Sequence, residues 1–458
     1  MQDYWTSNNR DTNMRLITLN LFSSLTILLL CTSCLVTDDH FSRLPNGSWR
    51  GVLKLDSRPV SSNPKGEPLP EKLNLKFDEV TDGELPFTFE ITYITEDSFV
   101  MDLINGTEKI RASEIYFGRD KYLAKDTFRI NFPTYDTYLH GLYEENVMEG
   151  EWVINYRTEF NKIPFVAKFG QNHRFTQLKK EPIMNLTGSW ETEFGLVEGE
   201  DPYPGVAEFK QTGNYLTGTF LTETGDYRYL EGTVQLNKLY LSVFDGSHAF
   251  LFEGKINPDS TINGIFRSGK HYQTIWKAKP QKNSTLRDPN SITQLVSDQP
   301  LSFEFPDVNG NLVSLNDIKG KVKIIQLFGT WCPNCLDETN FILDYLSKNK
   351  DKSISVIGLA FERYTEKEKV LPILSSYKTR LKIPFPILWA GSYNKKEASK
   401  VLPMLNGITA FPTLLILDEN DRVVKIHTGF NGPATSQYEF FKRDFEESIE
   451  KILNISNK

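Results

Sequence analysis

Residues 322–335 read Val322-Lys323-Ile324-Ile325-Gln326-Leu327-Phe328-Gly329-Thr330-Trp331-Cys332-Pro333-Asn334-Cys335, a largely apolar run that leads directly into two cysteines. The run has the composition of a buried central strand. The segment that follows, residues 336–348, spaces its apolar side chains as one face of a helix. The sequence therefore predicts that both cysteines lie at a strand-to-helix turn.

At this predicted position we expect the two cysteines to have different chemical roles. A cysteine in the first turn of a helix faces unpaired backbone N–H groups and the positive end of the helix dipole, which favour its thiolate. We therefore expect Cys332 to be the nucleophile and Cys335, three residues on, to resolve the mixed disulfide that Cys332 forms. Two alternatives are half a zinc site, for which no second ligand pair exists, and a structural disulfide, whose short loop gains little closure entropy.

The surrounding sequence resembles a known family. A hairpin signal, Asn309-Gly310-Asn311, precedes the cysteines, and Thr409-Ala410-Phe411-Pro412-Thr413 follows them just before an apolar strand at residues 414–418. On these residues, the segment 300–458 resembles the thioredoxin fold and, within it, the TlpA-like thiol–disulfide oxidoreductases of bacterial envelopes. The resemblance implies catalytic roles for Cys332, Cys335 and Pro412, with Pro412 as a cis-proline facing the dithiol.

The resemblance also implies further site residues. Trp331 and Phe411 would contact the substrate, with the Phe411 backbone pairing with an incoming peptide. Gln326 stands where thioredoxins place a buried acid. Glu362, at the end of a predicted strand over residues 354–361, would substitute for that acid by deprotonating Cys335. The alternative is that Glu362 is an exposed glutamate at a strand end.

The N-terminus has the pattern of an export signal. Residues 16–30 are almost wholly apolar, and Arg10 and Arg15 precede them. The run is short for a membrane-spanning helix, which needs about 20 apolar residues. Cys31-Thr32-Ser33-Cys34 then resembles the lipobox of bacterial lipoproteins, in which Cys34 would be lipidated. An uncleaved signal anchor and a soluble secreted protein are the alternatives.

Residues 47 to about 280 have the short alternating runs and regular turn signals of antiparallel β-structure. Gly47-Ser48-Trp49 is echoed by Gly188-Ser189-Trp190, and residues 148–152 are echoed by residues 262–266. These echoes favour two copies of an antiparallel meander or barrel, split near Lys180, over one continuous β-domain. The aromatic residues recur at strand period, which favours a core over a ligand pocket.

The fold class expected is a multidomain chain with an antiparallel β-rich N-terminal region, a duplicated meander or barrel, followed by an α/β thioredoxin-like domain. The expected domains are a lipoprotein signal peptide (1–34), a tether (35–46), β-rich domain 1 (47–180), β-rich domain 2 (185–280), a linker (281–299) and the thioredoxin-like domain (300–458).

These features predict an envelope-anchored thiol–disulfide oxidoreductase facing the periplasm, held to the membrane by the lipid on Cys34. It would exchange disulfides with periplasmic proteins, acting as a reductant rather than an oxidant, and it would receive electrons from a membrane donor. No cofactor is expected, and the net charge of -7 argues against nucleic-acid binding. The alternatives are a thiol peroxidase of the peroxiredoxin type and a ligand- or partner-binding lipoprotein with an accessory redox domain.

Overall fold

The computed structural model describes residues 43–55, 82–282 and 286–455. The predicted signal peptide, Cys34 and the tether up to residue 42 lie outside these residues, as do three residues of the predicted linker. The described residues from Leu44 onward form one compact unit. Within the described ranges, no helix combines the length and the apolar character needed to cross a membrane.

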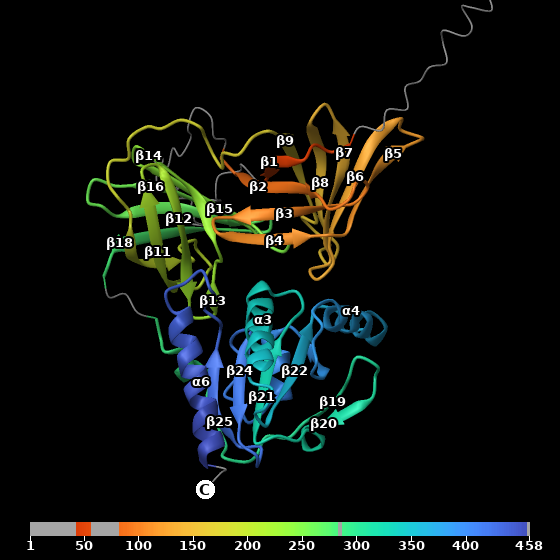
Figure 1. The fold of residues 1–458 in the computed structure, drawn as a ribbon. Coiled ribbons are helices and arrows are strands. Elements are labelled where there is room, and N and C mark those ends of the chain that lie inside the picture. Colours follow the sequence, from red (N-terminus) through yellow and green to blue (C-terminus); the bar gives the residue numbers. More distant parts are fainter. Residues whose placement is uncertain (1–42, 56–81, 283–285, 456–458) are drawn as a thin grey trace, which may run out of the picture. The chain divides into compact units, whose positions relative to one another are not determined.

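The first β-sheet is a nine-stranded antiparallel meander with the strand order β4-β3-β2-β1-β9-β8-β7-β6-β5 (Figure 1). The first and last strands of the meander pair with each other, so β4 and β5 form the two edges. The strands are β1 (Gly47–Lys54), β2 (Glu84–Tyr93), β3 (Phe99–Asn105), β4 (Glu108–Ala112), β5 (Ile115–Asp120), β6 (Lys125–Phe132), β7 (Thr137–Glu144), β8 (Val147–Ile154) and β9 (Lys162–Phe169).

The second β-sheet repeats this strand order but closes on itself. Its order is β11-β10-β18-β17-β16-β15-β14-β12-β13, and β11 also pairs with β12. All strands except β13 therefore form a closed ring. The strands are β10 (Gly188–Phe194), β11 (Tyr203–Thr212), β12 (Tyr215–Thr222), β13 (Gly225–Asp226), β14 (Leu230–Gln235), β15 (Lys238–Phe244), β16 (Ala249–Ile256), β17 (Ile262–Ser268) and β18 (Tyr272–Pro280).

The two sheets begin with the same local structure. Trp49 in β1 donates its Nε1 hydrogen to the Pro45 carbonyl at 3.2 Å, and Trp190 in β10 donates to the Leu186 carbonyl at 2.8 Å. Each indole thus returns to the carbonyl four residues earlier and is buried against its own sheet. The Gly-Ser-Trp echo in the sequence therefore marks equivalent first strands.

The core of the first sheet includes side chains from the second sheet. Phe244 of β15 lies 4.8 Å from Phe87 and 5.1 Å from Trp152, measured between ring centroids. The two sheets therefore share part of their core. The division into separate β-rich domains at residues 47–180 and 185–280 stays a prediction. The predicted fold class, a β-rich region followed by a thioredoxin-like domain, is confirmed.

The C-terminal part is a five-stranded mixed sheet, ordered β23-β22-β21-β24-β25, with helices around it (Figure 1). The central strand β21 is buried along its whole length, as its apolar sequence predicts. The elements are α2 (Pro289–Ile292), β19 (Glu304–Pro306), β20 (Leu312–Ser314), η1 (Leu315–Asp317), β21 (Val322–Phe328), α3 (Pro333–Lys348), β22 (Ile354–Glu362), α4 (Lys367–Arg380), β23 (Ile387–Ser392), α5 (Lys395–Val401), β24 (Thr413–Leu417), β25 (Val423–Thr428) and α6 (Tyr438–Ile455).

Candidate active site

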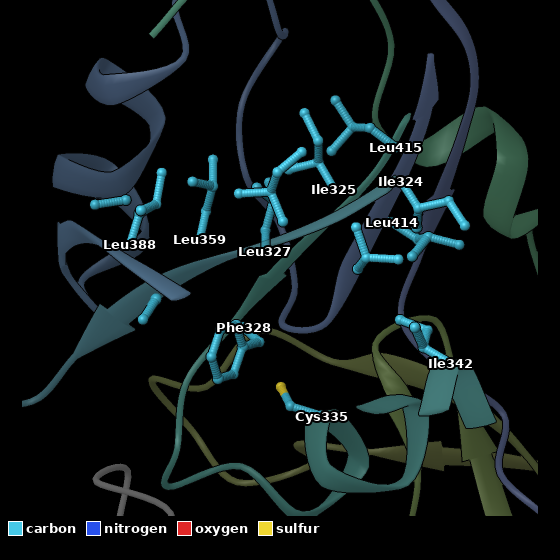
Figure 2. Packing of buried hydrophobic residues seen from close by; sticks show 14 of the residues in the cluster. Ile324, Ile325, Leu327, Phe328, Cys335, Ile342, Leu359, Leu388, Leu414 and Leu415 are labelled. Carbon is cyan, nitrogen blue, oxygen red and sulfur yellow. The ribbon is translucent and has the colours of Figure 1, made fainter. Parts of the chain in front are cut away.

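The two cysteines lie at the turn from β21 into α3, as the sequence predicts. Cys332 is the N-cap residue of α3, and its Sγ accepts a hydrogen bond from the Cys335 backbone N–H at 3.3 Å. Both thiols are free, and Cys332 is 7% exposed whereas Cys335 is fully buried. Figure 2 shows the Cys335 side chain at the start of α3, pointing toward Phe328 at the end of β21. The helix thus places a slightly exposed sulfur at its start and a fully buried sulfur behind it.

The buried position of Cys335 opposes its ionisation. Burial raises the pKa of the Cys335 thiol well above its ordinary value, and the adjacent Cys332 sulfur and the Glu338 carboxylate raise it further. A thiol in this environment stays protonated until a nearby base removes its proton. Cys335 is therefore suited to act second, after a partner has reacted with Cys332.

Glu338 is a functional candidate that the sequence reasoning missed. It lies one helical turn after Cys335 and is fully buried. Its Oε2 accepts a hydrogen bond from Gln326 Nε2 at 3.0 Å, and Oε1 has no hydrogen-bond partner among the described residues. Burial raises the pKa of Glu338 to about 8. The sequence does contain a signal: a glutamate three residues after Cys335 falls on the inward face of the helix.

Gln326 connects Glu338 to the cysteine turn. Besides its bond to Glu338, the Gln326 amide donates to the Cys335 carbonyl oxygen at 3.1 Å. Its own oxygen accepts from the Thr339 hydroxyl at 3.0 Å. The strand β21 thus supplies the amide of Gln326 where thioredoxins have a buried acid, and the buried carboxyl group comes from Glu338 of α3.

Glu362 lies at the end of β22 and is buried, which excludes the alternative of an exposed strand-end glutamate. Its two oxygens accept hydrogen bonds from the backbone N–H and the hydroxyl of Thr330, both at 2.9 Å. Burial raises the pKa of Glu362 to about 7, although the Thr330 bonds oppose the shift. The structure therefore places Glu362 against the residue two positions before Cys332, and its action on Cys335 stays a prediction.

The remaining predicted site residues of the C-terminal part converge on Cys332. The Phe411–Pro412 peptide bond is cis. The Cys332 Sγ lies 3.6 Å from the Phe411 carbonyl oxygen. The rings of Trp331 and Phe411 meet edge to face, with centroids 6.0 Å apart. Backbone and aromatic surface of Phe411 thus border the nucleophilic sulfur.

A cavity of about 580 Å³ lies beside this cluster. Its wall includes Trp331 and Glu362 from the C-terminal part and Tyr135 and Tyr156 from the first β-region. The guanidinium of Arg363 lies 3.5 Å from the Tyr156 ring centroid and 5.0 Å from that of Trp331. The β-rich region therefore contributes residues to the surroundings of the cysteine motif, and not only to its own core.

Comparison with known proteins identifies the class of this domain. Residues 295–439 match the family model described as Redoxin, so the C-terminal third is a Redoxin domain. The match covers less than half of the chain.

Relatives of the same third are named for redox chemistry. The chain is 24% identical over 134 residues to the thiol-disulfide oxidoreductase ResA of Halalkalibacterium halodurans, covering 29% of this chain and 69% of that protein. It is 26% identical over 147 residues to ResA of Bacillus subtilis, covering 32% of this chain and 74% of ResA. The predicted resemblance to thiol–disulfide oxidoreductases is confirmed for this third of the chain.

A solved structure aligns with the same third. It is a thiol:disulfide interchange protein of the thioredoxin family from Chlorobium tepidum TLS. The alignment has 24% sequence identity and a TM-score of 0.27, and it covers 34% of this chain and 98% of that chain.

Proposed function

We propose that this protein is a thiol–disulfide oxidoreductase whose Cys332–Cys335 pair exchanges disulfides with polypeptide partners. The Cys332 thiolate attacks one sulfur of the partner's disulfide, which forms a mixed disulfide and releases the partner's other sulfur as a thiolate. Cys335 then loses its proton and attacks Cys332 Sγ. This step releases the partner's second thiolate and leaves a Cys332–Cys335 disulfide, so two electrons pass to the partner.

One observation carries the proposal: Cys332 caps a helix whose first turn holds a fully buried second thiol. The backbone N–H groups at this helix start stabilise a negative sulfur at position 332. The Phe411 carbonyl at 3.6 Å gives a docked peptide backbone a neighbouring polar group. Nucleophile, resolving thiol and docking edge thus lie together at the start of α3.

Glu338 is the proton acceptor in this scheme. Its charge acts on Cys335, and it has one carboxylate oxygen without a hydrogen-bond partner among the described residues. With a pKa of about 8, Glu338 is mostly protonated at neutral pH, so the deprotonated fraction that can accept the Cys335 proton grows as the pH rises toward 8. Glu362 has a different role from Glu338 in this proposal. Its bonds to Thr330 fix the backbone that leads into Cys332.

The finer features of the proposal come from the sequence. The motif Cys332-Pro333-Asn334-Cys335 reduces periplasmic protein disulfides, and a membrane donor then reduces its own disulfide again. The chain is anchored to the cell envelope through a lipid on Cys34, which the lipobox-like residues 31–34 support. The names of the relatives support the disulfide chemistry alone.

The test is reduction of insulin by the full-length protein with dithiothreitol as the electron source. We expect the native chain to accelerate insulin precipitation and Cys332→Ser to abolish the acceleration. Asp344→Asn is the matched control, because it changes an exposed side chain on the same helix outside the proposed pair, and it should behave like the native protein. Equal activity of Cys332→Ser and the native protein would overturn the proposal, whereas turnover of hydrogen peroxide instead of insulin would favour the peroxidase.

A further inference from the structure

The second β-sheet contacts the cysteine motif on both sides of the nucleophile. Ser247, in the turn between β15 and β16, donates its hydroxyl hydrogen to the Trp331 carbonyl oxygen at 3.3 Å. On the other side, Asn334 donates Nδ2–H to the Asp226 carbonyl oxygen at 3.2 Å. The residues that flank Cys332 and Pro333 are therefore both held by one β-sheet.

A hairpin formed by residues 222–228, which contains β13, makes the contact with Asn334. Gly225, the first residue of β13, has φ +138°, and a Cβ there would come within 2.2 Å of Asn334 Nδ2 and 3.3 Å of the Phe430 carbonyl oxygen. The positive φ favours glycine at this position, and a side chain there would also displace the Asn334 amide at the start of α3.

The 222–228 hairpin also holds the loop that follows β25. Asp226 Oδ2 accepts a hydrogen bond from the Gly432 N–H at 2.6 Å. The same loop bonds to the Pro412 turn, because the Gly429 N–H donates to the Pro412 carbonyl oxygen at 2.9 Å. The hairpin thus lies on the helix start and on the loop beside Pro412. These are the two segments between which a polypeptide would approach Cys332.

Arg228 fixes the base of the 222–228 hairpin. It is buried, and its Nη1 donates to Asp337 Oδ2 at 2.6 Å. Asp337 belongs to α3, two residues after Cys335. The same guanidinium bonds to Glu108 of β4 and lies 3.5 Å from Asp245. One cation therefore links the hairpin to the first sheet, the second sheet and the redox helix, and charge-assisted bonds of this kind are strong when they are buried.

We propose that the 222–228 hairpin closes the polypeptide-docking side of the dithiol, so that a protein disulfide reaches Cys332 only after the hairpin has moved away. This inference rests on the proposed function. A peptide strand placed against the Phe411 backbone would pass the helix start and the 429–432 loop, and the hairpin contacts both of these segments. Small reagents need less space, and they should depend less on hairpin opening. Partner access is then limited by the population of the open state.

The test loosens the hairpin in two different ways. Gly225→Ala introduces a Cβ against Asn334, and Arg228→Gln removes the cation that links the hairpin to Asp337. Gly213→Ala is the matched control, because Gly213 also has positive φ in a turn of the same sheet, but a Cβ there meets nothing within 4 Å. Two rates are measured on the full-length reduced protein: insulin reduction, and iodoacetamide alkylation of Cys332 located by mass spectrometry.

We expect at least one loosened variant to reduce insulin at least about threefold faster than the native protein, with a smaller gain in the alkylation rate. Gly213→Ala should match the native protein in both. Native or slower insulin reduction in both Gly225→Ala and Arg228→Gln would overturn the inference. Absence of insulin reduction in every protein would overturn the proposed function instead; closure would then be judged by whether Cys332 alkylation rises in the loosened variants.

Discussion

The two nine-stranded sheets share a strand order and a first-strand tryptophan, yet they solve the packing problem differently. In the second sheet, β12 pairs with β14, so the ring closes and β13 is left as a two-residue strand. In the first sheet, the equivalent β4 is five residues long and forms an edge. The comparison shows the effect of a single strand pairing. Where β12 pairs with β14, the sheet closes and fills its interior with its own side chains; without such a pairing, the first sheet stays open and its core includes side chains of the second sheet.

The aromatic contacts express this difference. Inside the closed ring, Phe220 and Phe252 stack with centroids 4.3 Å apart, and both belong to the second sheet. The open sheet instead receives Phe244 from outside, against Phe87 and Trp152. The closed sheet therefore supports the open one, and it is also the sheet that reaches the cysteine motif through β13.

The largest expected effect comes from removing this shared ring. Phe244→Ala should lower the free energy of unfolding by about 3–5 kcal/mol, because a buried aromatic leaves a cavity. Amide hydrogen exchange should show the loss of protection in β2 and β8 of the first sheet. Phe252→Ala, an equally buried control, should lose protection inside the ring only. Identical exchange patterns for the two variants would break the comparison.

The next largest expected effect concerns buried acids, which are paired differently in the second sheet and in the C-terminal third. In the second sheet, buried Glu253 faces buried Arg267, whereas Glu338 faces the neutral Gln326. The folded dithiol form keeps Glu338 protonated up to its pKa of about 8, against 4.5 in its ordinary state. The folded state then binds more protons between these values, so the free energy of unfolding falls as pH rises through that window.

Replacing the acid tests this sign. Glu338→Gln should remove about 1–3 kcal/mol of the fall between pH 5 and pH 8, measured by urea unfolding of the reduced protein. Glu362, with a pKa of about 7, should account for part of the fall that remains. Asp344→Asn changes an exposed acid on the same helix and should keep the native pH slope. A native slope in Glu338→Gln would refute the buried-acid account.

The smallest effect is expected where the two sheets are alike. Lys109 pairs with Glu90 on the open sheet at 3.4 Å, and Lys279 pairs with Glu191 on the closed ring at 3.2 Å. All four side chains are exposed, so Lys109→Ala and Lys279→Ala should each cost less than about 1 kcal/mol. A clearly larger loss for only one variant, measured by thermal unfolding, would show that sheet closure reaches the surface pairs.

Local signals explain how much of this architecture the sequence predicts. The apolar run before Cys332, the helical spacing after it and the Gly-Ser-Trp echo each depend on neighbouring residues, and each corresponds to an observed element. The contact of Gly225 with Asn334 joins residues more than 100 positions apart, and no local pattern encodes it. Glu338 is intermediate: its inward position follows from helical periodicity, but its burial depends on the sheet beneath it.

The central claim is that Cys332 forms the bond to the partner and Cys335 breaks it. The most direct measurement is disulfide trapping: full-length Cys335→Ala and Cys332→Ala proteins are incubated with insulin and separated on non-reducing gels. The account predicts that Cys335→Ala accumulates a mixed disulfide that mass spectrometry locates at Cys332, and that Cys332→Ala accumulates none. A mixed disulfide through Cys335, or none in either variant, would contradict it.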